Sequence, residues 1–181
     1  MRVIAGKAKG HRLRSVPGGE TRPITDRAKS ALFSIIGNDI VGSRFLDLFA
    51  GTGQVGIEAL SRGAEMAVFV EQARPALRTI RQNLAHTRLG ERARVVRADV
   101  FAFLSGPPAP YEYVYVAPPQ YRGLWKRTLQ ALDRAPGWLA ADGWAIVQIH
   151  PQEYEPLSWE HLSLFDRRTY GSVMLCFYCL S

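Results

Sequence analysis

The fold of this chain is decided by R-F-L-D-L-F-A-G-T-G-Q-V-G, the stretch that runs from Arg44 to Gly56. An apolar run reaches a carboxylate at Asp47 and then breaks into a glycine loop that opens a helix. In a parallel α/β sheet, this order of elements places a nucleotide-like cofactor at the carboxyl end of a strand. The glycines Gly51, Gly53 and Gly56 also fit the G-x-G-x-x-G pattern of dinucleotide-binding proteins, so the loop alone leaves the cofactor open.

Three acidic residues narrow the choice of cofactor. A carboxylate at Asp47 would repel a pyrophosphate, whereas it attracts the ammonium and sulfonium groups of S-adenosylmethionine. Glu71 ends a second apolar run, where it is placed to accept hydrogen bonds from ribose hydroxyls. Asp99 ends a third run, where its carboxylate and the N–H of Val100 suit an adenine. The alternative is that Glu71 and Asp99 only cap the helices that follow them.

Length and composition suit one globular domain, because the chain has 181 residues of which 47% are hydrophobic. Residues 1–7 contain no apolar leader segment, and no run approaches the roughly 18 apolar residues of a membrane span. We therefore expect a cytoplasmic protein with no membrane partner. Cys176 and Cys179 stand three positions apart in an expected strand and point to opposite faces. We expect them to be buried, with no metal bound.

Basic residues are concentrated at the start of the chain. The net charge is +7, and residues 1–30 hold eight Lys or Arg against Glu20 and Asp26. By subtraction, the rest of the chain carries only about +1. Glycines interleave this basic segment, which we interpret as a mobile hairpin or arm that lies on nucleic-acid phosphates. The alternative is a solvated N-terminus, which is what a run of charges usually is.

Strand and helix signals alternate along the chain. Thr25 caps the first expected helix, Pro75 lies in the first turn of the third, and Gly171 with Ser172 forms a hairpin turn. The expected helices cover residues 26–36, 54–62, 74–86, 100–104 and 123–134. The expected strands cover residues 44–49, 66–71, 94–97, 111–116, 143–149, 161–170 and 173–180. The pattern indicates an α/β fold with a mostly parallel seven-stranded sheet and an antiparallel C-terminal edge strand. We divide the chain into a basic N-terminal hairpin and helix, residues 1–38, and a main domain, residues 39–181.

The expected fourth strand runs into Y-V-A-P-P-Q-Y, from Tyr115 to Tyr121, which faces the same crevice as the glycine loop. Pro118 and Pro119 stiffen the backbone, and Tyr121 offers a flat face for a base. The segment therefore suits an exocyclic amine that is held for methylation.

Over nearly its whole length, the sequence resembles the class I methyltransferases of the bacterial 16S ribosomal RNA guanine-N2 type, the RsmD-like family. The matching segments are R-V-I-A-G-K-A-K-G-H-R-L near the start, R-P-I-T-D-R-A-K-S-A-L-F at residues 22–33, D-L-F-A-G-T-G-Q-V-G-I-E-A-L-S-R-G-A at residues 47–64 and Y-G-S-V-M-L near the end. The resemblance implies a Rossmann-like methyltransferase fold, S-adenosylmethionine as cofactor, and 16S ribosomal RNA or an assembling small ribosomal subunit as partner. We expect a monomer that needs no metal.

The resemblance also assigns site residues. The methionine part of the cofactor is expected at Asp47 and the turn from Gly51 to Gly53, the ribose at Glu71 and the adenine near Asp99. The full set of expected cofactor residues is Thr25, Asp47, Phe49, Ala50, Gly51, Thr52, Gly53, Glu71, Gln72, Asp99, Val100 and Ala117. The expected catalytic loop is Ala117, Pro118, Pro119, Gln120 and Tyr121. The expected RNA-binding residues are Arg2, Lys7, Lys9, Arg12, Arg14, Arg22, Arg122 and Lys126.

The catalytic loop departs from the family pattern of Asn or Asp, two prolines and an aromatic residue. Because position 117 is Ala, the side-chain oxygen that would accept a hydrogen bond from the amine is missing. The backbone carbonyls of Ala117 or Pro118 and the amide of Gln120 are available replacements, of which we favour Gln120. Three alternatives stay open. The first is an NAD-dependent enzyme, for which 181 residues leave little room. The second is an RNA-binding protein that catalyses poorly or not at all. The third is a methyltransferase with another substrate.

Overall fold

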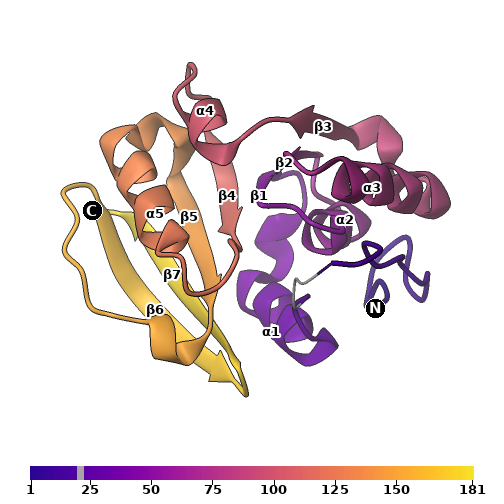
Figure 1. The fold of residues 1–181 in the computed structure, drawn as a ribbon, viewed down its shortest axis with the longest axis horizontal. Coiled ribbons are helices and arrows are strands. Elements are labelled where there is room, and N and C mark those ends of the chain that lie inside the picture. Colours follow the sequence, from indigo (N-terminus) through magenta and orange to yellow (C-terminus); the bar gives the residue numbers. More distant parts are fainter. Residues whose placement is uncertain (20–22) are drawn as a thin grey trace.

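The computed structural model describes residues 1–19 and 23–181. A seven-stranded sheet runs through the molecule, with helices on both faces (Figure 1). Its strands are β1 (Arg44–Leu48), β2 (Met66–Glu71), β3 (Ala93–Arg97), β4 (Tyr111–Val116), β5 (Leu139–Ile149), β6 (Leu162–Tyr170) and β7 (Val173–Leu180). The α-helices are α1 (Asp26–Ile36), α2 (Gln54–Ser61), α3 (Arg74–Thr87), α4 (Val100–Leu104) and α5 (Leu124–Arg134). Short 3-10 helices are η1 (Gly37–Ile40), η2 (Gly90–Arg92), η3 (Pro136–Trp138) and η4 (Pro151–Glu153). Over the described ranges, no helix has the length and apolar character needed to cross a membrane.

The strand order in the sheet is β3-β2-β1-β4-β5-β7-β6. The strands from β3 to β5 are parallel, and Phe45 of β1 pairs with Ala67 of β2 on one side and Tyr113 of β4 on the other. β7 runs antiparallel to both β5 and β6. The chain order reverses between β1 and β4, which is the point where open α/β sheets bind their ligands.

Two hydrophobic layers flank the sheet. One face is covered by α1, α2 and α3, where Ile57 and Ile80 belong to the same buried cluster as Phe45 (Figure 1). The other face is covered by α4 and α5, where Leu129 belongs to the cluster of Leu46. Successive residues of β1 therefore serve opposite layers, as the alternation of side chains along a strand requires.

The predicted mostly parallel seven-stranded sheet is confirmed, and β2, β4, β7, α1 and α4 have their predicted bounds. Two details differ. β5 begins at Leu139 rather than at residue 143, because Leu139 pairs with Tyr111 ahead of a register shift, after which Tyr113 pairs with Trp144. β7 lies inside the sheet, and β6 forms the edge. The apolar sequence of β7 is buried along most of its length, whereas β6 exposes most of its residues to solvent.

The N-terminal segment is a docked hairpin, which corrects the expectation of a mobile arm. Arg2 and Arg12 form an antiparallel bridge, and Val3, Ala8 and Leu13 are buried in the layer that contains α2. The basic side chains of this hairpin remain exposed at Arg2, Lys7, Lys9, Arg12 and Arg14. The division of the chain at residue 38 stays a prediction.

Glu58 of α2 anchors this hairpin. Its fully buried carboxylate accepts the N–H of Ile4 at 2.9 Å and that of Ala5 at 3.1 Å. The same carboxylate pairs with Lys29 Nζ at 3.4 Å and Arg62 Nε at 2.8 Å. The hairpin, α1 and α2 therefore meet at one buried ion-pair network.

Gly6 sets how closely the hairpin approaches α2. The N–H of Lys7 donates to the carbonyl of Ser61 at 2.8 Å, and a Cβ on Gly6 would lie 2.0 Å from that carbonyl oxygen. Gly6→Ala should therefore lower the free energy of unfolding by ~2 kcal/mol more than Gly10→Ala. Gly10 is a matched control, because its φ of +87° resembles the +85° of Gly6 while a Cβ there has no neighbour within 4 Å. Urea unfolding measures the difference, and equal losses would mean that backbone strain alone sets the effect.

Candidate active site

A cavity of about 560 Å³ opens at the carboxyl ends of the parallel strands. Loops that follow β1, β2, β3 and β4 supply most of its walls. The predicted site residues that line it are Asp47, Phe49, Ala50, Gly51, Thr52, Glu71, Gln72, Asp99, Val100, Ala117, Pro118, Pro119, Gln120 and Arg122. The predicted residues Thr25, Gly53 and Tyr121 are not part of this lining. The predicted cofactor loop and most of the predicted catalytic loop therefore enclose one space.

Asp47 is 2% exposed and lines the cavity from β1. Its Oδ2 accepts the N–H of Gly56 at 3.2 Å. Burial raises the pKa of this carboxyl well above its ordinary value, the hydrogen bond from Gly56 opposes the shift, and the charge of Glu71 adds to it. A cation placed beside Asp47 would favour its ionised form, so the position suits a positively charged ligand.

The glycine loop turns through left-handed backbone. The angle φ is 60° at Phe49, 57° at Gly51 and 79° at Gly53, where α2 is capped. A Cβ on Gly56 would lie 2.4 Å from the ring of Phe69, so this glycine lets α2 pack close to β2. Unlike the glycines of this loop, Phe49 has a side chain that makes a positive φ costly. Phe49 lines the cavity, and strained backbone of this kind is often found at ligand-binding sites.

Glu71 organises the loop that leaves β2. Its Oε1 accepts the N–H of Gly51 at 3.0 Å, which ties the glycine loop to β2. Its Oε2 accepts the N–H groups of Gln72 and Ala73, both at 2.9 Å. The capping role that the sequence left open is not found for Glu71, because the N-cap of α3 is Ala73 and no side chain among the described residues caps this helix. The carboxylate of Glu71 instead orders the loop before α3 and lines the cavity.

Asp99, in contrast, caps the helix that follows it, α4. Its Oδ1 accepts the N–H of Phe101 at 2.9 Å and that of Ala102 at 3.0 Å. The N–H of Val100, at the first helical position, has no acceptor inside the helix. Asp99 and Val100 both line the cavity, so an acceptor and a donor stand side by side there.

Thr25 and Gly53 act on the backbone. The hydroxyl of Thr25 accepts the N–H of Ala28 at 3.1 Å and caps α1, while the preceding residues Pro23 and Ile24 reach the cavity. Gly53 supplies the left-handed turn that begins α2. The helix cap and the loop glycine that the sequence indicated are both present, but neither residue is part of the cavity lining.

The catalytic loop brings Ala117, Pro118, Pro119 and Gln120 to the cavity. Gln120 is partly buried, and its side-chain amide makes no hydrogen bond with the residues that the structure describes. A carboxamide that lines the cavity and has no hydrogen-bond partner among the described residues is available to a ligand. Ala117 also lines the cavity, and it presents only a methyl group there.

Tyr121 stands outside the cavity lining, with 61% of its surface exposed. Its backbone is left-handed, with φ at 61°, and its N–H donates to Oε1 of Glu153 at 2.7 Å. Its ring centroid lies 5.8 Å from that of His150. The phenol ring therefore offers an open face next to the cavity, and its stacking on a base stays a prediction.

Two cavity residues that the sequence analysis missed are Tyr115 of β4 and Gln148 of β5. The hydroxyl of Tyr115 hydrogen-bonds to Oε1 of Gln148. Burial raises the pKa of Tyr115 well above its ordinary value, with a further contribution from the charge of Asp47, so the hydroxyl stays neutral. No local signal marks this pair, because it depends on β4 and β5 being neighbours in the sheet.

The predicted RNA-binding residues lie in two places. The exposed side chains of the hairpin carry five of them, and Arg2 approaches Asp26 at 3.5 Å. Arg122 lines the cavity, and Lys126 pairs with Glu155 at 2.9 Å. Arg22 lies outside the described residues.

Metal ligands are not gathered anywhere in residues 1–19 and 23–181, where no group of three or more His, Cys, Asp or Glu could hold an ion. Cys176 is buried, and burial raises the pKa of its thiol to about 12. The expected burial is therefore confirmed for Cys176, whereas Cys179 is only partly buried.

Comparison with known proteins identifies the relatives of this chain. The model of the family described as Conserved hypothetical protein 95 matches residues 1–179. Ribosomal RNA small subunit methyltransferase D of Escherichia coli (strain K12) is 35% identical over 173 residues, which are 96% of this chain and 86% of that protein. The solved structure of the Escherichia coli protein yhhF is 34% identical, with a TM-score of 0.88 over 100% of this chain and 98% of that one.

A more distant structure shares the fold. It is an RNA methyltransferase from Salinibacter ruber in complex with S-adenosyl-L-homocysteine, 12% identical, with a TM-score of 0.66 over 86% of this chain and 92% of that one. The mixed seven-stranded sheet is therefore that of the class I methyltransferases, as the sequence predicted. The family match spans the hairpin, the glycine loop, the A-P-P-Q-Y segment and the C-terminal strands together, and the chain belongs to the RsmD-like family.

Proposed function

We propose that this chain transfers a methyl group from S-adenosylmethionine to an exocyclic amine of a base in RNA, and that the target is N2 of a guanine in 16S ribosomal RNA. Membership of the RsmD-like family supports an rRNA methyltransferase, in accord with the name of the Escherichia coli relative. The observation that carries the proposal is the shared cavity, in which Asp47 and the A-P-P-Q loop line one space. A substrate in free 16S RNA or in an assembling small subunit places the protein in the cytoplasm, where we expect it to act as a monomer.

The residues of the cavity fit S-adenosylmethionine. The cavity has a volume of about 560 Å³, which holds a nucleoside with an amino-acid tail. The acidic residues of the cavity lie at the ends of three successive strands. Asp47 would balance the cofactor's positive charge, Glu71 would accept from the ribose hydroxyls, and Asp99 with the Val100 N–H would hold the adenine. When bound, this cofactor supplies an electrophilic methyl group on a sulfonium.

The A-P-P-Q loop would position the amine. Pro118 and Pro119 restrict the backbone of this loop. The loop is therefore already ordered before a base enters, and binding costs less conformational entropy. Oε1 of Gln120 would accept a hydrogen bond from the amine and aim its lone pair at the methyl group. As the new N–C bond forms, the bond between the methyl carbon and sulfur would break, so that S-adenosylhomocysteine is the leaving group. The methylated nitrogen would then lose a proton to water. Tyr121 would stack on a base that has been flipped out of its own stack.

Methyl transfer from labelled S-adenosylmethionine tests the proposal. Free 16S RNA and small-subunit particles from cells that lack this protein are the two substrates. We expect label in N2-methylguanine with at least one of them. Tight cofactor binding without any transfer would overturn the activity, and label in another nucleotide would overturn the guanine target. Tighter equilibrium binding of NAD than of S-adenosylhomocysteine would overturn the cofactor.

Gln120→Ala should lower the rate of transfer at saturating substrates about tenfold, the effect of losing one neutral hydrogen bond. Gln130→Ala is the matched control, because Gln130 is exposed on α5 and does not line the cavity. Single-turnover kinetics measure both variants. Adding Ala117→Asn to Gln120→Ala should recover part of the rate by restoring a side-chain oxygen at position 117. An unchanged rate in Gln120→Ala would assign the amine contact to the backbone carbonyls instead.

A further inference from the structure

A second groove, of about 610 Å³, lies on α3 and the end of β3. Its lining comprises Arg74, Leu77, Arg78, Arg81, Gln82, Ala85 and Arg97. The four arginines are exposed, and three of them are spaced along one face of α3. Successive arginines on this face are about 5 Å apart along the helix axis, which is close to one helical turn. We call this set, Arg74, Arg78, Arg81 and Arg97, the α3 arginine groove.

The charge of the groove is not balanced within the molecule. Residues 74–97 hold seven arginines and one glutamate. Within residues 1–19 and 23–181, no carboxylate lies within 4.0 Å of the guanidinium of any of the four groove arginines. The helix spacings from Arg74 to Arg78 and from Arg78 to Arg81 bring like charges together, which destabilises a helix. Arg74 places a positive charge at the N-terminus of α3, where the helix dipole disfavours cations. The first turn of α3 contains no acidic residue that would offset this charge.

Protection of a sheet edge from pairing with another chain, or simple exposure to solvent, explains only part of this arrangement of arginines. Arg97 ends the edge strand β3, where a charge discourages pairing with another sheet. The arginines of α3 protect no strand edge, and an ordinary exposed helix face would mix charges of both signs. Like charges gathered against local helix stability indicate a surface that meets an anionic partner.

The groove joins the two regions already described. At one end, Gln72, Ala73 and Ala76 line the cofactor cavity, and Arg74 lies between them in the sequence. At the other end, the N–H of Arg14 donates to Oδ1 of Asn83 at 2.8 Å, and Nδ2 of Asn83 donates to the carbonyl of Arg14 at 3.1 Å.

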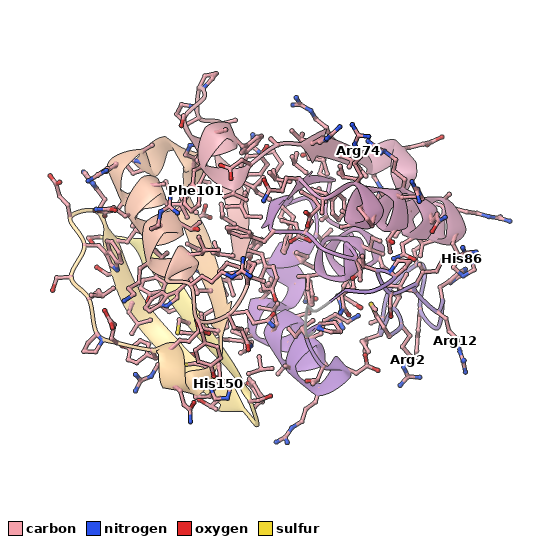
Figure 2. The ribbon with its side chains drawn as sticks, viewed as in Figure 1. Arg2, Arg12, Arg74, His86, Phe101 and His150 are labelled. Carbon is pink, nitrogen blue, oxygen red and sulfur yellow. The ribbon has the colours of Figure 1, made fainter. Side chains whose placement is uncertain are left out.

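The rings of His11 and His86 also meet edge to face, with centroids 5.3 Å apart. Figure 2 shows Arg74, His86, Arg12 and Arg2 along the same side of the molecule. Basic side chains therefore continue from the docked hairpin along α3 to the loop at the cofactor cavity.

We propose that the α3 arginine groove binds successive backbone phosphates of the RNA and holds the strand that flanks the target nucleotide between the cavity and the hairpin. The inference rests on the proposed function insofar as it takes RNA as the partner. Guanidinium groups pair with phosphate oxygens through two hydrogen bonds, and such contacts fix register without reading sequence. A row of arginines over two helical turns fits a linear polyanion better than a single small anion.

Arg78→Gln with Arg81→Gln tests the groove, and Arg134→Gln with Arg168→Gln is the control. Both doubles remove two positive charges from exposed positions, and the control positions lie on α5 and β6. The groove double should raise the Kd for 16S RNA and the KM for RNA about tenfold, and it should flatten the slope of log K against log salt by about 1.5. The Kd for S-adenosylhomocysteine and the rate at saturating RNA should stay as in the wild type. The control should change the RNA affinity less than twofold.

The outcomes separate this inference from the proposed function. A groove double whose RNA affinity and salt slope match those of the control would overturn the inference even if methyl transfer is confirmed. A wild type that binds RNA with the predicted dependence on the groove, yet transfers no methyl group, would overturn only the proposed function. A wild type that does not bind RNA would overturn both. Bound RNA can also be displaced either by inorganic phosphate or by unlabelled RNA. If both displace half of it at the same concentration of phosphate groups, the groove is a small-anion site instead. Thermal unfolding of the groove double should match or exceed the wild type, because repulsion on α3 is relieved.

Discussion

Asp47→Asn should weaken the binding of S-adenosylmethionine on the order of 100-fold and slow methyl transfer by a similar factor at low cofactor concentration. Asparagine keeps the size of the side chain and an oxygen for the N–H of Gly56, which now lies 3.2 Å from Oδ2. It removes the negative charge. In a buried site, removing one partner of a charge pair costs about 3 kcal/mol, and each 1.4 kcal/mol is about tenfold in affinity. Equilibrium binding measures the loss.

The same substitution should stabilise the protein when no cofactor is bound. Burial raises the pKa of Asp47, so the folded state holds the proton more tightly than the unfolded chain does. The stabilisation from this group is complete below its unfolded pKa of about 3.9, and it is lost as the pH rises through the higher folded value. Asparagine has no such loss. Thermal unfolding from pH 4 upward should therefore show a growing advantage for the variant.

Two comparisons sharpen this test. Asp39→Asn makes the same chemical change at an exposed position on η1, so it should leave cofactor affinity unchanged. S-adenosylhomocysteine lacks the sulfonium charge, so a smaller loss for this ligand than for S-adenosylmethionine would place Asp47 against the sulfonium. A variant that binds both ligands like the wild type would refute the charge pairing, whatever its stability.

The cavity could be predicted from the sequence where its residues are adjacent in the chain. Asp47 and Gly51 are separated by one short loop, so the pattern of a strand, an acid and glycines was enough to place them. Tyr115 and Gln148 lie far apart in sequence, and their contact exists only because β4 and β5 pair in the sheet. A single sequence contains no local signal for that neighbour relation, so this part of the site required the structure.

The charges show a second limit. The basic hairpin stood out because its excess charge was summed over residues 1–30. The arginines of α3 did not, because acids elsewhere offset them in the total for the rest of the chain. The sequence also predicted a mobile hairpin or arm rather than a docked one, since Val3, Ala8 and Leu13 follow no helical or strand period among its charges. Their burial depends on contacts with α2, about fifty residues away.

Lys29→Met should lower the free energy of unfolding by about 3 kcal/mol, because it removes one of the two cations that pair with the buried carboxylate of Glu58 and leaves only Arg62 beside it. Lys29 Nζ lies 3.4 Å from Glu58, and it donates to the carbonyl of Arg2 at 2.7 Å and to Oε1 of Gln54 at 3.1 Å. Burial lowers the pKa of Lys29, and the charge of Glu58 opposes that shift. Urea unfolding measures the loss. Lys126→Met is the control, because its pair with Glu155 is exposed and contributes about 0.5 kcal/mol.

A double-mutant cycle shows whether charge balance is the reason. Glu58→Gln keeps an oxygen for one of the N–H groups of Ile4 and Ala5 while removing the charge that Lys29 balances. We expect the double variant with Lys29→Met to lose about 2 kcal/mol less than the sum of the two single variants. Strictly additive losses would assign the effect to the hydrogen bonds that Lys29 makes to Arg2 and Gln54. Because Glu58 also anchors the hairpin, Glu58→Gln should weaken RNA binding under conditions in which the sheet stays folded. The buried ion pair then supports function by fixing where the basic hairpin lies relative to α3.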